Sequence, residues 1–380
     1  MIRSICLAIG FIACAPAFAD IKAYNAAVKA GDYKTAAAEA EAIWQTWDKQ
    51  SPDTALMARE FGFAALVSGR NELAQTFGSF LVQNGKTLAT PDDQPATSAV
   101  LKAAADFKVS KQGEPERAVL RDALMARNAA PGADMTSVLA WQALYTASWS
   151  KADWANTVTE TAAAAEFFKR QPGSLISRQR EAEVAGAAAS FNDNRGRTTM
   201  SRNDFYDRMV DLHDAIVADI NAAKSASTRD QLWKAKWSAD AWSGAIYSYL
   251  SASYTKIGSN ISKAAKQRTL AQPATPQIAE DPALAAIPVC EGKFQGRQVQ
   301  YPEVRIAARM VGSVIVRMET DASGKVARAD VLSAIPGDGF EDRVLEAVKT
   351  WTYTPAKGVD TRSCRLASRN FVERFMFKLG

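Results

Sequence analysis

The chain has 380 residues, of which 47% are hydrophobic and 23% charged, a composition typical of a soluble globular protein with two or three domains. This composition excludes collagen-like, fibrous and wholly disordered chains. The 46 basic and 41 acidic residues give a net charge of +5 that is spread along the chain, so we expect no nucleic-acid partner. The one histidine, His213, excludes zinc sites that need several imidazoles and disfavours hydrolases with a Ser-His or Cys-His pair. An ordinary hydrolase is therefore disfavoured.

The first 19 residues have the pattern of a secretory signal peptide. Arg3 gives a basic start, residues 5–15 form an apolar run, and Ala17-Phe18-Ala19 fits the small-x-small rule of a cleavage site before Asp20. A membrane-spanning helix needs about 20 apolar residues, which is more than this run provides. We expect cleavage of residues 1–19 and a mature chain in a bacterial periplasm. An uncleaved helix that anchors the chain in the inner membrane is the alternative.

The cysteines fit an exported protein. Cleavage would remove Cys6 and Cys14 and leave Cys290 and Cys364. Two cysteines in an oxidising compartment most often form one disulfide, which here would tie the entry of the C-terminal segment to its last hairpin. Two free buried thiols are the alternative.

The periodicity of the sequence changes at a proline-rich segment. Residues 20–272 are rich in alanine and have helical periodicity, whereas the residues after 288 alternate with a period of two. Four prolines lie between these regions within 16 residues: Pro273, Pro276, Pro282 and Pro288. No helix tolerates that density of proline. The sequence thus predicts a multi-domain α plus α+β protein, with a helical domain at 20–272, a linker at 273–288 and a small domain at 289–380.

Short glycine-containing turns recur in the helical region. Ala30-Gly31-Asp32-Tyr33, followed by alanines four and eight residues after Asp32, resembles the helix-turn-helix junction of tetratricopeptide repeats. Similar units surround Gly69, Gly113 and Asp153, at irregular spacings that exceed the usual repeat of about 34 residues. We expect a degenerate tetratricopeptide-like repeat domain; stacked helical hairpins without a repeat relationship are the alternative.

The last helix of this region is rich in aromatic side chains. They are Trp233, Trp237, Trp242, Tyr247, Tyr249 and Tyr254. They would either line a groove for a ligand or peptide, or fill gaps between alanine-rich helices. We favour the second interpretation.

The C-terminal domain has a β-β-α-β pattern. Residues 312–319 and 325–332 alternate as strands around a turn at Asp321–Gly324, and residues 340–349 have the periodicity of an amphipathic helix. A short extended piece at 351–355 precedes a last strand at 369–379. Glu373 falls on the apolar side of that strand, which indicates a bulge or an exposed edge.

Motifs in this domain resemble those of the TonB C-terminal domain family. They are Gln300-Tyr301-Pro302, Gly312-x-Val314-x-Val316-x-Met318, Asp321-x-x-Gly324 and Trp351-x-Tyr353-x-Pro355, in the order and spacing of that family. The resemblance extends from residue 300 to residue 379. It implies a binding module and not an enzyme, so we expect no catalytic residues, no metal site and no cofactor. The implied domain lies in the periplasm and binds a short peptide, the TonB box of an outer-membrane transporter, as an added strand beside its last strand.

The resemblance also implies which residues contact the partner. These are Gln300, Tyr301, Pro302, Arg369, Asn370 and Val372. The implied partner is an outer-membrane TonB-dependent transporter or another envelope protein. A weak homodimer through the open edge and an inner-membrane partner stay open.

Two features of TonB energy transducers are missing from this sequence. Those proteins begin with an uncleaved membrane helix and contain a long proline-rich rod, whereas this chain has a short apolar start and only 14 prolines. We therefore expect a periplasmic adaptor or accessory protein of TonB-type transport. The alternative is a true energy transducer for a TonB-dependent transporter, anchored by a retained N-terminal helix.

Overall fold

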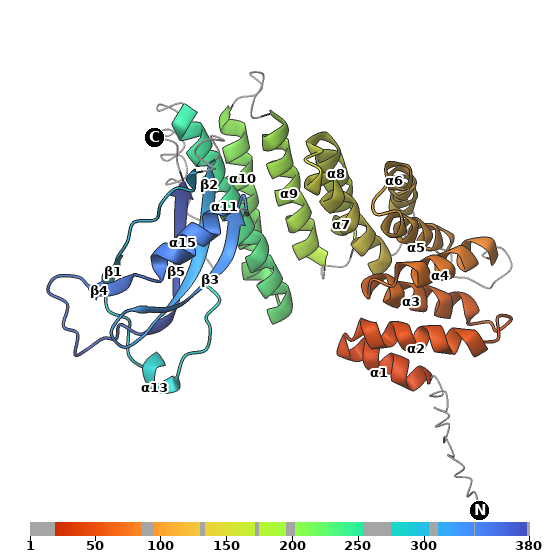
Figure 1. Cartoon of the computed structure of the whole chain (residues 1–380), viewed down its shortest axis with the longest axis horizontal. Helices are drawn as coiled ribbons and strands as arrows, with labels where there is room; N and C mark the ends of the chain where they lie inside the picture. The colour runs from red at the N-terminus through yellow and green to blue at the C-terminus, as the bar shows by residue number, and fades with distance from the viewer. Residues whose placement is uncertain are drawn as a thin grey trace, which may run out of the picture. The chain divides into compact units, whose positions relative to one another are not determined.

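The computed structural model describes residues 20–84, 94–129, 134–171, 175–194, 202–253, 275–303, 311–337 and 339–377. The predicted signal peptide lies outside these residues. The chain divides into two compact units, Met1–Ala147 and Ser148–Gly380 (Figure 1). The domain bounds expected from the sequence stay a prediction. Of the helices described, none combines the length and the apolar content that crossing a bilayer requires.

The first unit is built from consecutive helices that pack on their neighbours in sequence. They are α1(Ile21–Ala30), α2(Tyr33–Thr46), α3(Thr54–Val67), α4(Asn71–Asn84), α5(Gln94–Val109) and α6(Glu114–Ala129), followed by α7(Met135–Ser150). The boundary between the two units falls within α7, after Ala147. The core between α2, α3 and α4 is aromatic, because the ring of Trp44 packs edge-on against those of Phe61, Phe77 and Phe80. Buried alanines allow these helices to approach closely.

The predicted tight turn between the first two helices is present. Gly31 ends α1 with a φ of 74°, a left-handed conformation that glycine adopts without a steric penalty. Asp32 then caps α2, and its carboxylate accepts a hydrogen bond from the Thr35 N–H at 3.1 Å. Gly69 has a φ of 79° in the corresponding turn before α4. These turns fit stacked helical hairpins, and the tetratricopeptide-like relationship stays a prediction.

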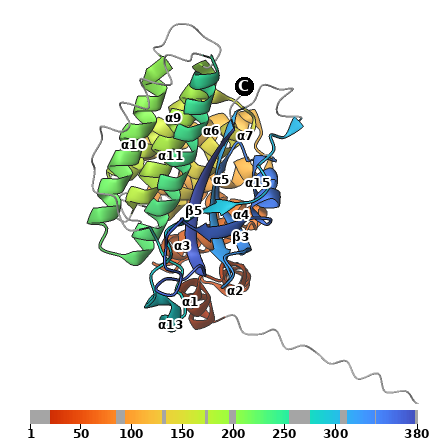
Figure 2. The ribbon, with the colours of Figure 1, turned by 90° about the vertical axis from the view of Figure 1, so that its left-hand side faces the viewer.

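Four long helices of the second unit lie side by side (Figures 1 and 2). They are α8(Trp154–Lys169), α9(Ile176–Asn194), α10(Arg202–Ala222) and α11(Ala226–Ser253). Trp233 and Trp242 of α11 are buried in their common core, together with Phe191 and Phe205. The aromatic residues of α11 thus fill the core of the bundle, as favoured from the sequence; Tyr254 lies outside the described residues.

A polar contact links two of these helices. His213 Nδ1 on α10 lies 2.7 Å from Asp240 Oδ1 on α11, and Lys236 Nζ lies 2.8 Å from Asp240 Oδ2. Burial acts to raise the pKa of Asp240, but the hydrogen bond with His213 and the charge of Lys236 lower that pKa overall. The single histidine therefore has a structural partner.

The C-terminal part of the second unit follows the β-β-α-β order predicted from the sequence. Its elements are α13(Pro282–Ala285), β1(Gly292–Gln295), β2(Gly312–Thr320), β3(Val326–Ile335), α15(Phe340–Val348), β4(Thr352–Pro355) and β5(Ser368–Phe377). The main sheet is antiparallel with the order β3-β2-β5, and β1 pairs with β4 in a second, two-stranded sheet. Strand β1 was not predicted from the sequence.

The three-stranded sheet is covered on both faces. Val314 and Val316 of β2 pack against Phe340 and Val344 of α15 in the small core. On the other face lies α11, which contacts all three strands. Gly244 of α11 sits so close to β2 that a Cβ atom there would lie 2.6 Å from the Oγ of Ser313. Because both faces are covered, a partner can reach the backbone of the sheet at its edges and not through its faces.

Candidate functional site

Strand β5 forms one edge of the three-stranded sheet. It pairs with β2 along one side, in a register that places Phe375 opposite Val314 and Val372 opposite Arg317. Within the described residues, no strand pairs with its other side. Such an edge presents unpaired backbone N–H and C=O groups that another extended chain can use.

The side chains of β5 alternate between the two faces of the sheet, and this alternation sets how the strand lies. Phe371, Phe375 and Phe377 belong to the core on the α15 side of the sheet. The intervening side chains, among them Val372 and Met376, lie on the α11 side, since successive residues of a strand point to opposite faces. Burial of the phenylalanines on one side therefore fixes the register of the edge strand.

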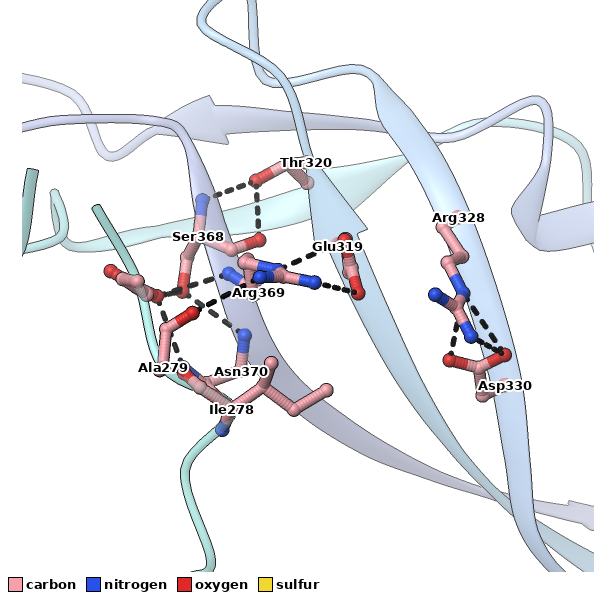
Figure 3. Close-up of polar contacts among 10 residues, drawn as sticks. Ile278, Ala279, Glu319, Thr320, Arg328, Asp330, Ser368, Arg369 and Asn370 are labelled. Carbon is pink, nitrogen blue, oxygen red and sulfur yellow. Dashed lines mark hydrogen bonds and ion pairs between the residues drawn. The ribbon is translucent and has the colours of Figure 1, made fainter.

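The start of β5 holds a segment from the predicted linker, residues 275–281, which we call the strap. The Asn370 carboxamide Oδ1 accepts a hydrogen bond from the Ile278 N–H at 2.7 Å, and its Nδ2 donates to the Ile278 carbonyl at 3.1 Å. A single side chain thus pairs with both backbone groups of Ile278 (Figure 3). This pairing resembles the one that a neighbouring strand would make.

Glu280 is the anionic anchor of the strap. Its Oε1 accepts hydrogen bonds from Ser368 Oγ at 2.9 Å, from the Arg369 N–H at 3.0 Å and from Asn370 Nδ2 at 3.1 Å. Its Oε2 forms an ion pair with Arg365, and only 9% of the Glu280 side chain is exposed. Burial acts to raise the pKa of this carboxyl, but the hydrogen bonds and the charge of Arg365 outweigh it and lower the pKa.

Arg369 ties the strap to the sheet. Its Nη1 donates to the Ala279 carbonyl at 3.0 Å, and its Nε lies 3.3 Å from Glu319 Oε2 on β2. In Figure 3 its guanidinium lies between these two partners. Arg317 of β2 adds a hydrogen bond of 2.8 Å to the carbonyl of Pro276. The two predicted contact residues at the start of β5, Arg369 and Asn370, are therefore engaged by the chain itself.

The other predicted contact residues have different surroundings. Val372 is half-buried in the middle of β5, and Gln300 is exposed. Tyr301 packs its ring 5.5 Å from that of Phe377, burial raises its pKa, and Pro302 is buried. Tyr301 therefore lies at the far end of β5, about 20 Å along the strand from Asn370. The structure does not gather the six residues at one point, and their contact role stays a prediction.

The loop before β5 is covalently fixed. Cys290 and Cys364 form a disulfide, as the sequence predicted. Next to it, the Cys290 N–H donates to the Arg365 carbonyl at 2.9 Å, and the Arg365 N–H donates to the Pro288 carbonyl at 2.9 Å. The disulfide thereby fixes the position of the adjacent Arg365, the ion-pair partner of Glu280.

The strap and its partners were not predicted from the sequence. Glu280 and Ser368 are 88 residues apart in the sequence, and Glu280 lies between prolines in a segment assigned as a linker. The local sequence gives one hint: a proline-containing segment can lie extended at the edge of a sheet, because proline cannot donate a backbone hydrogen bond within it.

Two other features of the molecule bear on metal and ligand binding. Among the residues that the structure describes, no group of three or more His, Cys, Asp or Glu side chains is placed to hold a metal ion. The first unit contains a pocket of about 350 Å³ between α3, α5 and α7. Its lining includes Leu66, Val67, Ala104, Lys108, Leu139 and Gln142.

Comparisons with known proteins place the resemblance in the same region. Residues 297–370 match the family model described as "Gram-negative bacterial TonB protein C-terminal". Protein TonB of Escherichia coli (strain K12) is 38% identical over 60 residues, which cover 16% of this chain and 25% of that protein. Protein TonB of Salmonella typhimurium (strain LT2) is 31% identical over 83 residues, which cover 22% of this chain and 34% of that protein. The chain thus spans only a quarter to a third of the length of these relatives. The resemblance to the TonB C-terminal domain family is confirmed for residues 297–370.

Proposed function

We propose that the chain is a periplasmic protein of TonB-type transport whose C-terminal domain binds a peptide of an envelope partner by strand addition to β5. The observation that carries the proposal is the outer side of β5, which no strand of the described residues occupies. The family match in the same domain supports the partner class, an outer-membrane TonB-dependent transporter or another envelope protein.

Strand addition here would use the second half of β5. The first half holds the strap through Arg369 and Asn370, whereas the stretch from Val372 to Phe377 has no such occupant among the described residues. Along an antiparallel edge strand, the backbone groups of alternate residues point outward, so a short peptide gains several hydrogen bonds there. Side chains on either face of the edge then discriminate between peptides.

The helical region has the role of a second docking element in this proposal. The pocket of the first unit, with apolar walls and Lys108 at its lining, supports a binding role for these helices. With one element that docks an envelope protein and another that binds a peptide, the chain acts as an adaptor.

Residue-resolved amide hydrogen exchange on the full chain tests strand addition. The probe is a synthetic peptide with the TonB box of an outer-membrane transporter from the same bacterium. We expect alternate amides between Val372 and Phe377 to exchange more slowly when the peptide is present. Binding without protection along β5, or no binding by any such peptide, would overturn the proposal.

Proline variants give a matched pair. Along β5, N–H groups that bond to β2 alternate with N–H groups that point to the open edge. Of the variants Val372→Pro and Glu373→Pro, one therefore removes a donor at the open edge and the other removes a hydrogen bond to β2. We expect one variant to keep the fold, judged by circular dichroism, and to lose peptide affinity. Full affinity in both variants would argue against pairing at this edge.

A further inference from the structure

Two neighbouring charges lie on the unoccupied half of β5. Glu373 is paired in register with Val316 of β2, and Arg374 with Ile315. Both side chains are exposed, and they point to opposite faces of the sheet because they are adjacent in a strand. Glu373 shares the α15 side with Phe371 and Phe375, whereas Arg374 lies on the α11 side.

Neither of these side chains has a counter-ion in the described part of the chain. The charged residues at the start of the strand differ, since Arg369 is paired with Glu319 and Arg365 with Glu280. Partial desolvation raises the pKa of the Glu373 carboxyl, as expected for a carboxylate near an apolar core without a compensating cation.

The surroundings of Glu373 are aromatic and contain its own negative charge. Burial raises the pKa of Tyr353 on neighbouring β4, and the charges of Glu291 and Glu373 add to that rise. On the same face, the ring of Phe375 lies 5.4 Å from that of Trp351 and the ring of Phe371 lies 4.5 Å from that of Tyr353, so a cation placed beside Glu373 would meet a carboxylate and aromatic rings. On the other face, Arg374 lies next to Met376, which is 39% exposed. A partner strand with an acidic side chain beside an apolar one would complement these two residues.

We propose that β5 selects a partner strand in which a Lys or Arg faces Glu373 and an adjacent Asp or Glu faces Arg374. This inference rests on the proposed function and specifies the partner of the same edge. An added strand places directly opposed residues on the same face, and opposite charges in such cross-strand pairs attract whereas like charges repel. The order of the two charges in the peptide depends on its direction: the base comes first in a parallel strand and the acid first in an antiparallel one.

A peptide panel with the full chain tests the charge selection. Three valine- and threonine-rich peptides differ only at two central positions, which are Lys-Asp, Asp-Lys or Thr-Thr, and their affinities are measured by fluorescence anisotropy at low and high salt. We expect one charged order to bind about 2- to 20-fold more tightly than the other, with the difference reduced by salt. Equal affinity of all three peptides would overturn the charge selection.

The decisive variant is the double exchange Glu373→Arg with Arg374→Glu. It leaves the net charge of the protein unchanged and alters only exposed side chains, so the fold is expected to persist. The variant should invert the preference between Lys-Asp and Asp-Lys and leave the Thr-Thr affinity unchanged. An unchanged preference would refute the assignment of these two residues.

The two proposals fail in distinguishable ways. If the peptides protect the β5 amides but show no charge preference, strand addition stands and the selection by Glu373 and Arg374 is wrong. If no peptide protects β5, the proposed function itself is wrong.

Discussion

Asn370 holds the backbone of Ile278 through both ends of its carboxamide, at 2.7 Å to the N–H and 3.1 Å to the carbonyl. These residues are 92 positions apart in the sequence. The strap, an extended segment of the same chain, therefore lies against β5. This is the strand that the resemblance predicts to bind an extended partner peptide. This contact limits the free edge of β5 to its second half.

Replacing Asn370 with alanine should release the strap. The variant loses the two hydrogen bonds to Ile278 and one to Glu280, each of which contributes about 0.5–1.5 kcal/mol. We expect faster hydrogen exchange at the Ile278 amide and a fall of about 1–3 kcal/mol in the local free energy of opening. Gln277→Ala is the matched control, because that side chain donates a hydrogen bond to the Thr275 carbonyl within its own segment and has no partner on β5 among the described residues. Equal exchange at Ile278 in both variants would contradict this assignment.

The contribution of Glu280 should depend on pH. Its pKa is lowered in the folded protein, so its stabilisation is fully present above the unfolded pKa and is lost as the pH falls through the folded value. At neutral pH we expect Glu280→Gln to lower the unfolding free energy by about 1–3 kcal/mol, since hydrogen bonds to a charged group are lost. The difference between wild type and variant should begin to shrink near pH 4.5, where the carboxyl of the unfolded chain takes up a proton, and should vanish once the pH has fallen through the lower pKa of the folded protein.

Urea unfolding at several pH values between 7 and 3 measures that difference. Asp281→Asn serves as the control, because this neighbouring carboxylate caps the short helix α13 by accepting a hydrogen bond from the Ala283 N–H. A gap between Glu280→Gln and wild type that stays constant to pH 3 would show that the charge of Glu280 does not stabilise the strap.

The close approach of α11 to the sheet predicts the effect of enlarging Gly244. A methyl group there would lie 2.6 Å from Ser313 Oγ and 3.0 Å from Ser313 Cβ. Alanine favours a helix over glycine by about 1 kcal/mol, but overpacking costs about 1–3 kcal/mol. We expect Gly244→Ala to lower the unfolding free energy and to speed hydrogen exchange in β2.

A double-mutant cycle separates the steric effect from helix propensity. Ser313→Ala removes the nearer of the two atoms, so Gly244→Ala should be less destabilising in that background. Additive effects of the two substitutions would mean that α11 does not press on β2 at this position.

The elements that the sequence predicted are those with strong local signals. The alternation of Val314, Val316 and Met318 predicted β2, and Gly324, with a φ of 81°, forms the expected turn before β3. By contrast, β1 has four residues and pairs with β4 about sixty positions away, and short strands of this kind carry too little alternation to be recognised.

The candidate site was only partly predictable for the same reason. The resemblance pointed to β5, but the contacts of Asn370 and Glu280 join residues about ninety positions apart and depend on tertiary packing alone. Tyr301 and Pro302 carry the family motif, yet their apolar surfaces are used in packing, so the motif alone did not distinguish contact residues from core residues.

The adaptor proposal makes a prediction about the N-terminus. Residues 1–19 end in Ala17-Phe18-Ala19, which favours cleavage before Asp20. In protein purified from its native envelope, we expect an intact mass that corresponds to residues 20–380 and recovery in the soluble periplasmic fraction. Replacing Ala17 and Ala19 with leucine should block cleavage, because the processing site requires small residues at these positions, and should move the chain to the membrane fraction. A wild-type chain of full mass in the membrane fraction would instead favour the anchored energy transducer, since the uncleaved helix would then provide the attachment that force transmission requires.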